Sequence, residues 1–168
     1  MLNKKQLRLL FELIKNSKRS DRQVSKIIGV SQPTITRMRQ RLEKKAIMEY
    51  TVTPNMTDLG YELLAVTLIS TKGPAKSEEG QKETLEKRSK WMMKQPNIVF
   101  ACDGGGMDMD EMVISIHKDY TDFLELMTKL RFEWSGTIDK TQTFIASLKG
   151  GVILKPYSLK YLEEVTQV

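Results

Sequence analysis

Segment 20–42 constrains the fold most strongly, because two short helical patterns follow one another in it across a tight turn. Ser20 can cap the first helix, and Gln23 stands three residues later, where a capping box places Gln or Glu. Gly29 falls where a helix ends in a left-handed residue. Ser31 can cap the second helix. The segment therefore predicts two helices joined by a short turn.

The second helix of this pair is apolar on one side and polar on the other. Ile35, Met38 and Leu42 repeat at positions i, i+3 and i+7, which is the spacing of a buried helical stripe. The opposite face and its flanks hold polar side chains and a proline that the first helical turn tolerates, namely Pro33, Thr34, Thr36, Arg37, Gln40 and Arg41. Side chains of this kind contact base edges and phosphates in a major groove. The segment therefore predicts a helix-turn-helix that binds DNA.

Different residues of this motif are expected to contact different parts of DNA. Arg37 and Gln40 are the best candidates for base contacts. Other residues suit phosphates or sugars, because such contacts position a protein without specifying sequence, and backbone N–H groups at a helix start favour a phosphate. These candidates are Ser31, Gln32, Thr34, Thr36, Arg39 and Arg41, with Arg19 and Arg22 within reach of the flanking DNA backbone. The alternative for each is a solvated surface residue.

Charge is unevenly distributed along the 168 residues. Residues 1–54 contain 13 Lys and Arg against 4 Asp and Glu, a net charge of +9. Residues 55–168 contain 14 against 17, a net charge of −3. A basic module joined to a mildly acidic one indicates that one half faces a polyanion. A merely solvated basic surface is the alternative, but the basic residues coincide with the helix-turn-helix, which favours nucleic-acid binding.

Two further elements complete the N-terminal part. An amphipathic helix that Asn3 can cap precedes the motif, with Leu7, Leu10, Phe11 and Ile14 on its apolar side. After the motif, the alternating β-branched residues 47–53 predict a strand that Pro54 ends. We therefore expect residues 1–54 to form a winged helix-turn-helix domain and residues 55–60 to form a polar hinge.

The rest of the chain alternates strand and helix patterns. Strands are predicted at 62–70, 98–102, 111–117 and 138–148, and helices at 81–95 and 120–132. This β-α-β-β-α-β order is that of a ferredoxin-like domain, which we place at 61–149. Residues 150–168 form a C-terminal tail with a short helix. The predicted fold class is thus α+β, with a winged helix-turn-helix domain, a ferredoxin-like domain and a helical tail.

The first predicted strand of the second domain is apolar on both faces. Leu64, Val66 and Leu68 lie on the face that the two helices of such a domain leave uncovered. An uncovered apolar face favours a partner, and a second copy of the chain is the economical choice. A homodimer, or a larger oligomer, would present two helix-turn-helix motifs to a palindromic site with half-sites about one helical turn apart.

Enzymatic and metal-binding signatures are missing from the sequence. Cys102 is the single cysteine, which excludes an intrachain disulfide and argues against a cysteine-based zinc site; we expect it to be a core residue. His117 is the single histidine, which excludes a histidine-rich metal site. No P-loop, HExxH or Ser/His/Asp set occurs. With no signal peptide and no membrane-spanning run, we expect a cytoplasmic protein without a cofactor that is not an enzyme.

A glycine run precedes the third predicted strand of the second domain. Gly104, Gly105 and Gly106 suit either a ligand pocket or a hairpin loop, and the loop is favoured. Asp108 and Asp110 follow, and they are either receivers of an amino group from an amino-acid effector or solvated acids. The run lacks the spacing of a dinucleotide-binding fingerprint.

Taken together, the chain resembles the Lrp/AsnC family of archaeal and bacterial transcriptional regulators. The resemblance rests on VSKIIGVSQPTITRMRQRLEKKAIMEYTV (24–52), on Asp110 followed by EMVISI (111–116), and on the order of elements over residues 3–149. It implies a dimerising ferredoxin-like domain that often binds an amino acid or similar small molecule. It also implies a ligand site near the turn between the second and third strands, at an interface between subunits; here that turn is GGGMDMD (104–110).

Three functions compete at this point. The leading one is a homo-oligomeric, sequence-specific transcriptional regulator that binds double-stranded DNA. The second is an architectural chromatin-type protein with little sequence preference, in which phosphate contacts dominate. The third is an enzyme, because some haem-biosynthetic decarboxylases resemble the same two-domain architecture. A single histidine and an arginine-rich helix argue against the third.

Overall fold

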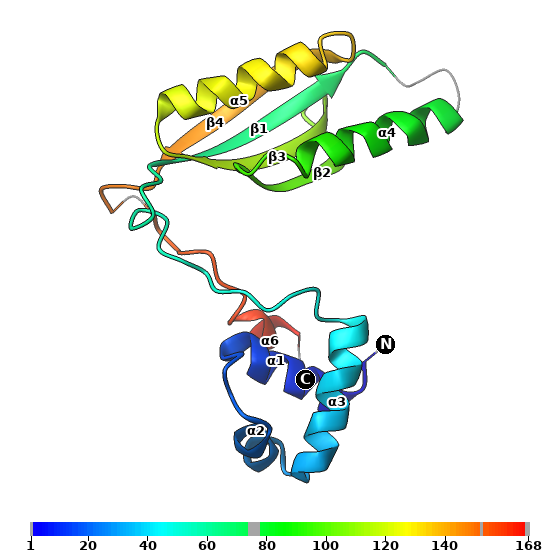
Figure 1. Ribbon diagram of the computed structural model, residues 1–168, viewed down its shortest axis with the longest axis vertical. Helices are drawn as coiled ribbons and strands as arrows, with labels where there is room; N and C mark the ends of the chain where they lie inside the picture. Colours follow the sequence, from blue (N-terminus) through cyan, green and yellow to red (C-terminus); the bar gives the residue numbers. More distant parts are fainter. Residues whose placement is uncertain (1, 74–77, 152, 167–168) are drawn as a thin grey trace. The chain divides into compact units, whose positions relative to one another are not determined.

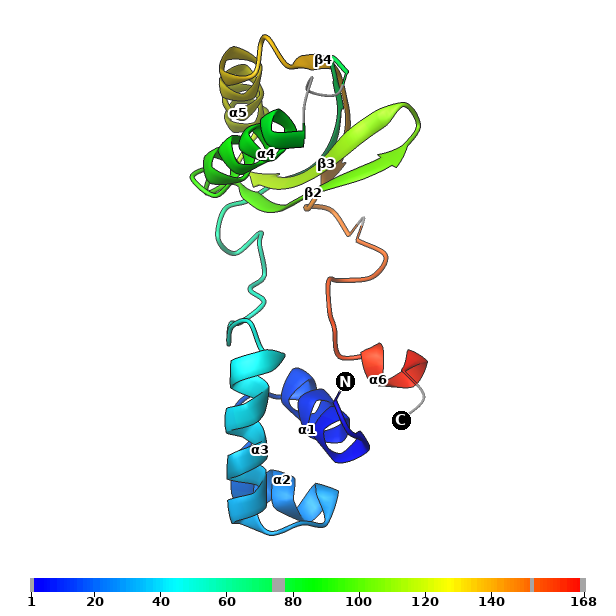
Figure 2. The ribbon, with the colours of Figure 1, turned by 90° about the vertical axis from the view of Figure 1, so that its right-hand side faces the viewer.

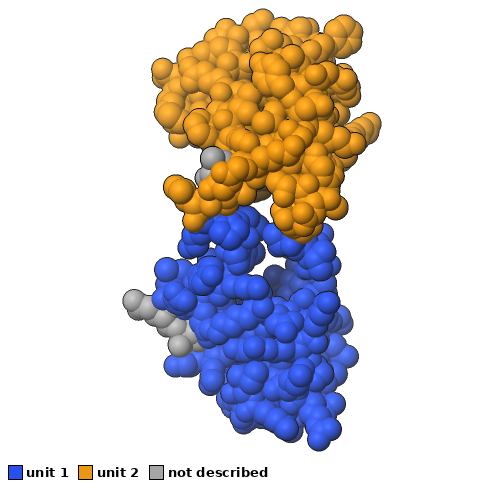
Figure 3. Space-filling model, turned by 90° about the vertical axis from the view of Figure 1, so that its left-hand side faces the viewer, with its two compact units in different colours: residues 1–53, 155–168 blue, residues 54–154 orange. Residues whose placement is uncertain are grey.

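The computed structural model describes residues 2–73, 78–151 and 153–166. The chain divides into two compact units (Figure 3). Unit 1 comprises residues 1–53 together with 155–168, and unit 2 comprises residues 54–154. The C-terminal tail therefore groups with the N-terminal helices, although the whole of unit 2 separates them in sequence. Among the described residues, no helix is both long and apolar enough to cross a membrane.

Unit 1 is built on three helices, α1 (Lys4–Lys15), α2 (Asp21–Ile28) and α3 (Gln32–Lys45), shown in Figure 1. Capping boxes begin the first two: Asn3 pairs with Gln6, and Ser20 pairs with Gln23. Gly29 ends α2 in the left-handed region at φ 77°, where a residue without a Cβ is least strained. The predicted helix-turn-helix and two of its three predicted caps are confirmed.

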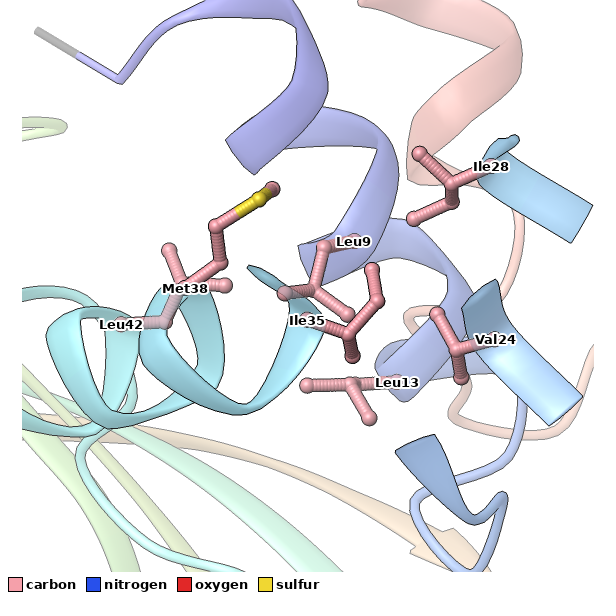
Figure 4. Close-up of a cluster of buried hydrophobic side chains, with 7 residues drawn as sticks. All are labelled: Leu9, Leu13, Val24, Ile28, Ile35, Met38 and Leu42. Carbon is pink, nitrogen blue, oxygen red and sulfur yellow. The ribbon is translucent and has the colours of Figure 1, made fainter. Parts of the chain in front are cut away.

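The three helices bury a shared apolar core. Its buried members are Leu9, Leu13, Val24, Ile28, Ile35, Met38 and Leu42, and Figure 4 shows them pointing toward one another from all three helices. The i, i+3, i+7 stripe of α3 supplies three of these residues, so the apolar face that the sequence predicts is the buried one. Burial of each such side chain contributes about 1.5–3 kcal/mol, which fixes how α3 is rotated about its axis.

Two local predictions in unit 1 are wrong. Ser31 occupies the N-cap of α3, but its side chain makes no capping hydrogen bond, because its hydroxyl pairs with that of Thr34 at 2.8 Å. The strand predicted at 47–53 is also absent, and these residues have no regular structure. A strand needs a neighbour for its N–H and C=O groups, and Met48 and Val52 are exposed rather than packed. Alternating sequence alone does not supply that neighbour.

Unit 2 is a four-stranded antiparallel sheet covered on one side by two helices. The strands are β1 (Leu63–Thr71), β2 (Ile98–Gly106), β3 (Met109–His117) and β4 (Ile138–Ser147), in the order β2-β3-β1-β4. Helices α4 (Glu78–Met92) and α5 (Tyr120–Glu133) lie on the same side of the sheet (Figure 2). The predicted β-α-β-β-α-β order and ferredoxin-like fold are confirmed.

The two faces of this sheet differ in what covers them. On the helix side, Ala65, Ile69 and Val113 pack with residues of α4 and α5 in a buried core. The other face, which we call the open face, carries alternate residues of the four strands. Its apolar members include Leu64, Val66, Leu68, Phe100, Met112, Ile114, Ile116 and Phe144, which the strand register places opposite or beside one another. Phe100 is 50% exposed and Phe144 is 72% exposed.

The described part of the tail contains one short helix, α6 (Leu162–Val165). Glu163 of α6 forms an ion pair with Lys15 at the end of α1, which also pairs with Glu12 at 3.3 Å. The short terminal helix expected from the sequence is therefore present, and its ion-pair partner lies in the first helix of the chain.

Candidate nucleic-acid interface

The solvent-facing side of α3 forms a shallow hollow of about 400 Å³. Gln32, Pro33, Thr36, Arg37 and Gln40 line it, and they belong to the face opposite the buried stripe. The helical period explains this grouping, because residues three and four apart share a face. Four residues that the sequence places on one polar face, together with Gln32 at the start of the helix, are thus brought together around one concave surface.

Three arginines of α2 and α3 carry charge without a partner among the described residues. Arg22, Arg37 and Arg41 are exposed, and their side chains form no ion pair or hydrogen bond with the described residues. Gln40 is likewise exposed and unpaired within the described part of the chain. An arginine presents five N–H donors in a rigid fork that matches phosphate oxygens and the acceptor edge of guanine. These side chains are available for an external anionic partner.

The threonines and the cap of α3 are more constrained. The Thr34 hydroxyl pairs with Ser31, and the Thr36 hydroxyl donates to Asp21 at 2.6 Å and to the Gln32 carbonyl at 3.2 Å. Gln32 remains exposed at the first position of α3, and its backbone N–H is free to favour an anion, whereas Pro33 has no N–H and the Thr34 N–H donates to the Ser31 carbonyl.

Arg39 occupies a different environment from the other arginines of α3. Its Nε donates to Asp21 Oδ1 at 2.7 Å, and its Nη2 donates to the Arg19 carbonyl at 2.9 Å. Its side chain is only 18% exposed. The phosphate contact expected for Arg39 therefore competes with internal bonds that already engage two of its three nitrogens. Arg19, expected to reach the flanking DNA backbone, is itself paired with Glu12.

The β2–β3 hairpin holds the candidate effector residues. Strand β2 continues through Gly104–Gly106, and the turn is made by Met107 and Asp108, both at φ 55°. A two-residue hairpin turn with positive φ at both central positions matches the twist of the flanking strands. The interpretation of the glycine run as the hairpin loop is therefore wrong, because the loop begins after it. The three glycines, like Asp108, are exposed.

Asp110 is structurally engaged at the end of β1. Its Oδ2 accepts hydrogen bonds from the Thr71 backbone N–H at 2.7 Å and from the Thr71 hydroxyl at 2.9 Å. The Thr71 backbone bond is the largest cause of a lowered Asp110 pKa, with the Thr71 hydroxyl next and the charge of Arg88 also contributing. Arg88 of α4 in turn pairs with the buried Glu111 and lies 3.8 Å from Asp103.

The single histidine and cysteine both lie in unit 2. His117 is fully buried, with its Nε2 2.8 Å from the Ser115 hydroxyl. Burial lowers the His117 pKa, although the nearby Asp122 opposes the shift. Cys102 is a half-buried free thiol on the open face, opposite Met112, so its prediction as a core residue is only partly met.

Residues 2–45 match the family of winged helix-turn-helix DNA-binding domains. Solved structures with similar architecture cover nearly the whole chain. An AsnC family transcriptional regulator from Agrobacterium tumefaciens has a TM-score of 0.76 at 14% identity, covering 94% of this chain and 95% of its own. LrpC from B. subtilis has a TM-score of 0.67 at 21% identity, covering 92% and 99%. The chain has the fold of the Lrp/AsnC regulators.

A third structure with the Lrp/AsnC fold is a transcriptional regulator, NMB0573, from Neisseria meningitidis, in complex with L-Met. It has a TM-score of 0.73 at 16% identity and covers 95% of this chain and 96% of its own. No curated protein matches the sequence. The resemblance to the Lrp/AsnC family that the sequence motifs indicate is thus confirmed at the level of the fold.

Replacing Asp110 by Asn is expected to destabilise this Lrp/AsnC fold at neutral pH but not in strong acid. A carboxylate whose folded-state pKa is lowered adds stability above its unfolded value, 3.8, and that stability is lost as the pH falls through the folded pKa. Urea unfolding followed by the fluorescence of Trp91 and Trp134 at pH 7 and pH 2 measures the difference. Asp108→Asn is the control, because Asp108 accepts no hydrogen bond within the described structure. An equal deficit at both pH values would contradict the assignment.

Proposed function

We propose that the protein is a DNA-binding transcriptional regulator that acts as a homo-oligomer and recognises a two-fold-symmetric operator. The observation that carries this proposal is the solvent-facing side of α3, where Arg37, Arg41 and Gln40 are unpaired around the hollow. This side belongs to a segment, 1–54, of net charge +9. The matched winged helix-turn-helix family supports the same use of the motif.

In this proposal α3 lies in the major groove with Arg37 and Gln40 facing base edges. Arginine pairs with the O6 and N7 acceptors of guanine, and glutamine pairs with the N6 and N7 groups of adenine. Arg22, Arg41 and the N-terminus of α3 at Gln32 contact phosphates, which fixes register without specifying sequence. Ser31 and Thr34 add hydrogen bonds from the edge of the same surface, whereas Thr36 lines the hollow with its hydroxyl already donated to Asp21.

A selection of bound duplexes from a random pool tests this function, and Arg37→Ala sharpens the test. The selected motif should be two-fold symmetric, with half-sites about 10 bp apart. Arg37→Ala should weaken binding to that site by about 1–3 kcal/mol and relax the preference at one base pair of each half-site. Arg131→Ala, which removes the same charge from an exposed position of α5, is the control and should change neither.

The possible outcomes separate the competing functions. Clear binding without enrichment, and an equal loss for Arg37→Ala on every sequence, would favour an architectural protein. Absence of binding to any duplex would reject the DNA-binding proposal.

The homo-oligomer is proposed to form through the open face of the sheet. Half-buried Leu68 lies on this face between Met112 and Gln142 on the neighbouring strands. An apolar surface of this extent is unusual on a monomer, and a second copy buries it on both partners at once. Leu68→Asp would place charges in that interface, so light scattering should report half the wild-type mass.

Phe132→Asp is the matched control for the interface. Phe132 is 84% exposed on α5, which belongs to the layer on the other side of the sheet. Its replacement should leave the mass unchanged. A mass that falls with Phe132→Asp and not with Leu68→Asp would move the interface to the helices.

We also propose an amino-acid effector at the β2–β3 hairpin, around Gly104, Gly105 and Gly106 with Asp108 as its ammonium acceptor. Asp110, the second candidate, already accepts two bonds from Thr71, which leaves Asp108 as the free carboxylate. The L-Met complex of the Neisseria regulator motivates the ligand class. Calorimetric titration of the twenty amino acids should find one that binds, and Asp108→Asn should weaken it at least tenfold. Equal binding after Asp108→Asn, or binding of none, would reject this site.

A further inference from the structure

Asp21 makes two hydrogen bonds that join α2 to the DNA-facing helix. It is the first residue of α2, and its two carboxylate oxygens accept from different residues of α3. Oδ1 accepts from Arg39 Nε at 2.7 Å, and Oδ2 accepts from the Thr36 hydroxyl at 2.6 Å. The Asp21 side chain is 19% exposed, so these bonds are largely shielded from water. Charge-assisted bonds of this kind are roughly twice as strong as neutral ones.

The guanidinium of Arg39 is held from further directions. Its Nη2 donates to the carbonyl of Arg19 in the loop before α2. Arg19 is itself anchored to α1 by its ion pair with Glu12. Tyr50, after α3, lies close enough for the charge of Arg39 to oppose the rise in its pKa that burial causes. Arg39 is therefore fixed by groups from the loop before α2 and from α2.

This arrangement has an electrostatic consequence for any polyanion that approaches α3. Each lysine or arginine that neutralises a phosphate on duplex DNA makes the slope of log K against log salt concentration more negative by about 0.9, whatever the sequence. Arg39 lies on the flank of α3 next to the N-terminus of α2, where Asp21 holds it, and on that flank it would add such a contact if it were free. Asp21 instead compensates its charge internally, so Arg39 contributes little to sequence-independent binding.

The same carboxylate also acts on the geometry of the reading surface. Thr36 lines the hollow of α3 and immediately precedes Arg37. Its bond to Asp21 ties this part of α3 to the N-terminus of α2. A side chain that reads a base edge must keep its position to within a fraction of an ångström, so a fixed helix rotation favours correct over incorrect bases.

We propose that Asp21 is a specificity-determining residue, which holds Arg39 away from the DNA backbone and thereby suppresses binding to non-operator sequences. The proposal rests on the DNA-binding function proposed above. Asp21 itself touches no base; it acts through Arg39 and Thr36 as a positioning residue. Its loss should therefore raise the affinity for random DNA while the affinity for the selected operator changes less.

The test measures the binding of full-length wild type and Asp21→Asn to the selected operator and to a random duplex, by fluorescence anisotropy from 50 to 300 mM KCl. Asn keeps the size of the side chain and an acceptor for one bond but removes the charge. On random DNA, the salt slope of Asp21→Asn should be steeper by about one unit, because one more arginine reaches a phosphate. The ratio of operator to random affinity should fall by about tenfold.

Two further variants separate the release of Arg39 from a simple change of net charge. Glu49→Gln removes the same charge from an exposed acid of unit 1 that has no partner among the described residues, and its slope should match that of wild type. Asp21→Asn combined with Arg39→Gln should return to the wild-type slope, because the freed arginine is gone. Thermal unfolding of each variant verifies that it is folded.

Defined outcomes would overturn the proposal. A wild-type slope and affinity ratio in Asp21→Asn would do so, and so would a steep slope that persists in the double variant. If Asp21→Asn does not fold, Arg39→Gln alone decides: an unchanged slope supports the internal role, and a slope shallower by about one unit places Arg39 on a phosphate. If the wild-type protein binds no DNA at all, the proposed function itself is rejected. Wild-type binding is therefore measured before any variant.

Discussion

The burial of the apolar stripe of α3 is the constraint on which the DNA-facing surface depends. Ile35 and Leu42 are fully buried against α1 and α2, and Met38 lies between them. Because a helix is a rigid cylinder, burying one face determines which residues occupy the other. Arg37 and Gln40 point to solvent for this reason, and no specific interaction is needed to expose them. The functional surface is thus a direct consequence of core packing.

The local periodicity of the sequence was sufficient to predict the helices of unit 1. It was not sufficient to predict which distant residues pair with one another. The caps at Asn3 and Ser20 are encoded within four residues, and the sequence predicts both correctly. Arg39 looks like its arginine neighbours in the sequence, yet its partner Asp21 lies 18 positions away. Charged residues are solvated by default, so the sequence alone favours an exposed arginine. Only the helix crossing in the folded unit brings the two side chains together.

Pairing between distant residues also explains why the strand predicted at 47–53 and the predicted position of the β2–β3 turn are wrong. The alternating residues 47–53 have strand propensity, but the described part of unit 1 contains no second strand to pair with them. In the β2–β3 hairpin, the glycine run has the composition of a loop, but the register pairs Gly106 with Met109. The turn therefore falls on Met107 and Asp108, where a positive φ is less expected than at glycine. Strand register depends on both strands, so composition of one segment does not locate the turn.

The placement of acids in unit 1 links its stability to its proposed partner. Residues 1–54 contain only four acids, and three of them face other residues of the unit. Glu12 pairs with Lys15 and Arg19, Asp21 with Arg39, and Glu43 accepts a bond from the Tyr50 hydroxyl. The acids thus stabilise the framework and compensate the basic residues nearest to it. Arg37 and Arg41 on the outer side of α3, and Arg22 on α2, have no partner among the described residues and add positive potential where a nucleic acid would bind. Other basic side chains of unit 1 are also unpaired among the described residues, namely Lys4, Lys5, Arg8, Lys18, Lys26, Lys44 and Lys45.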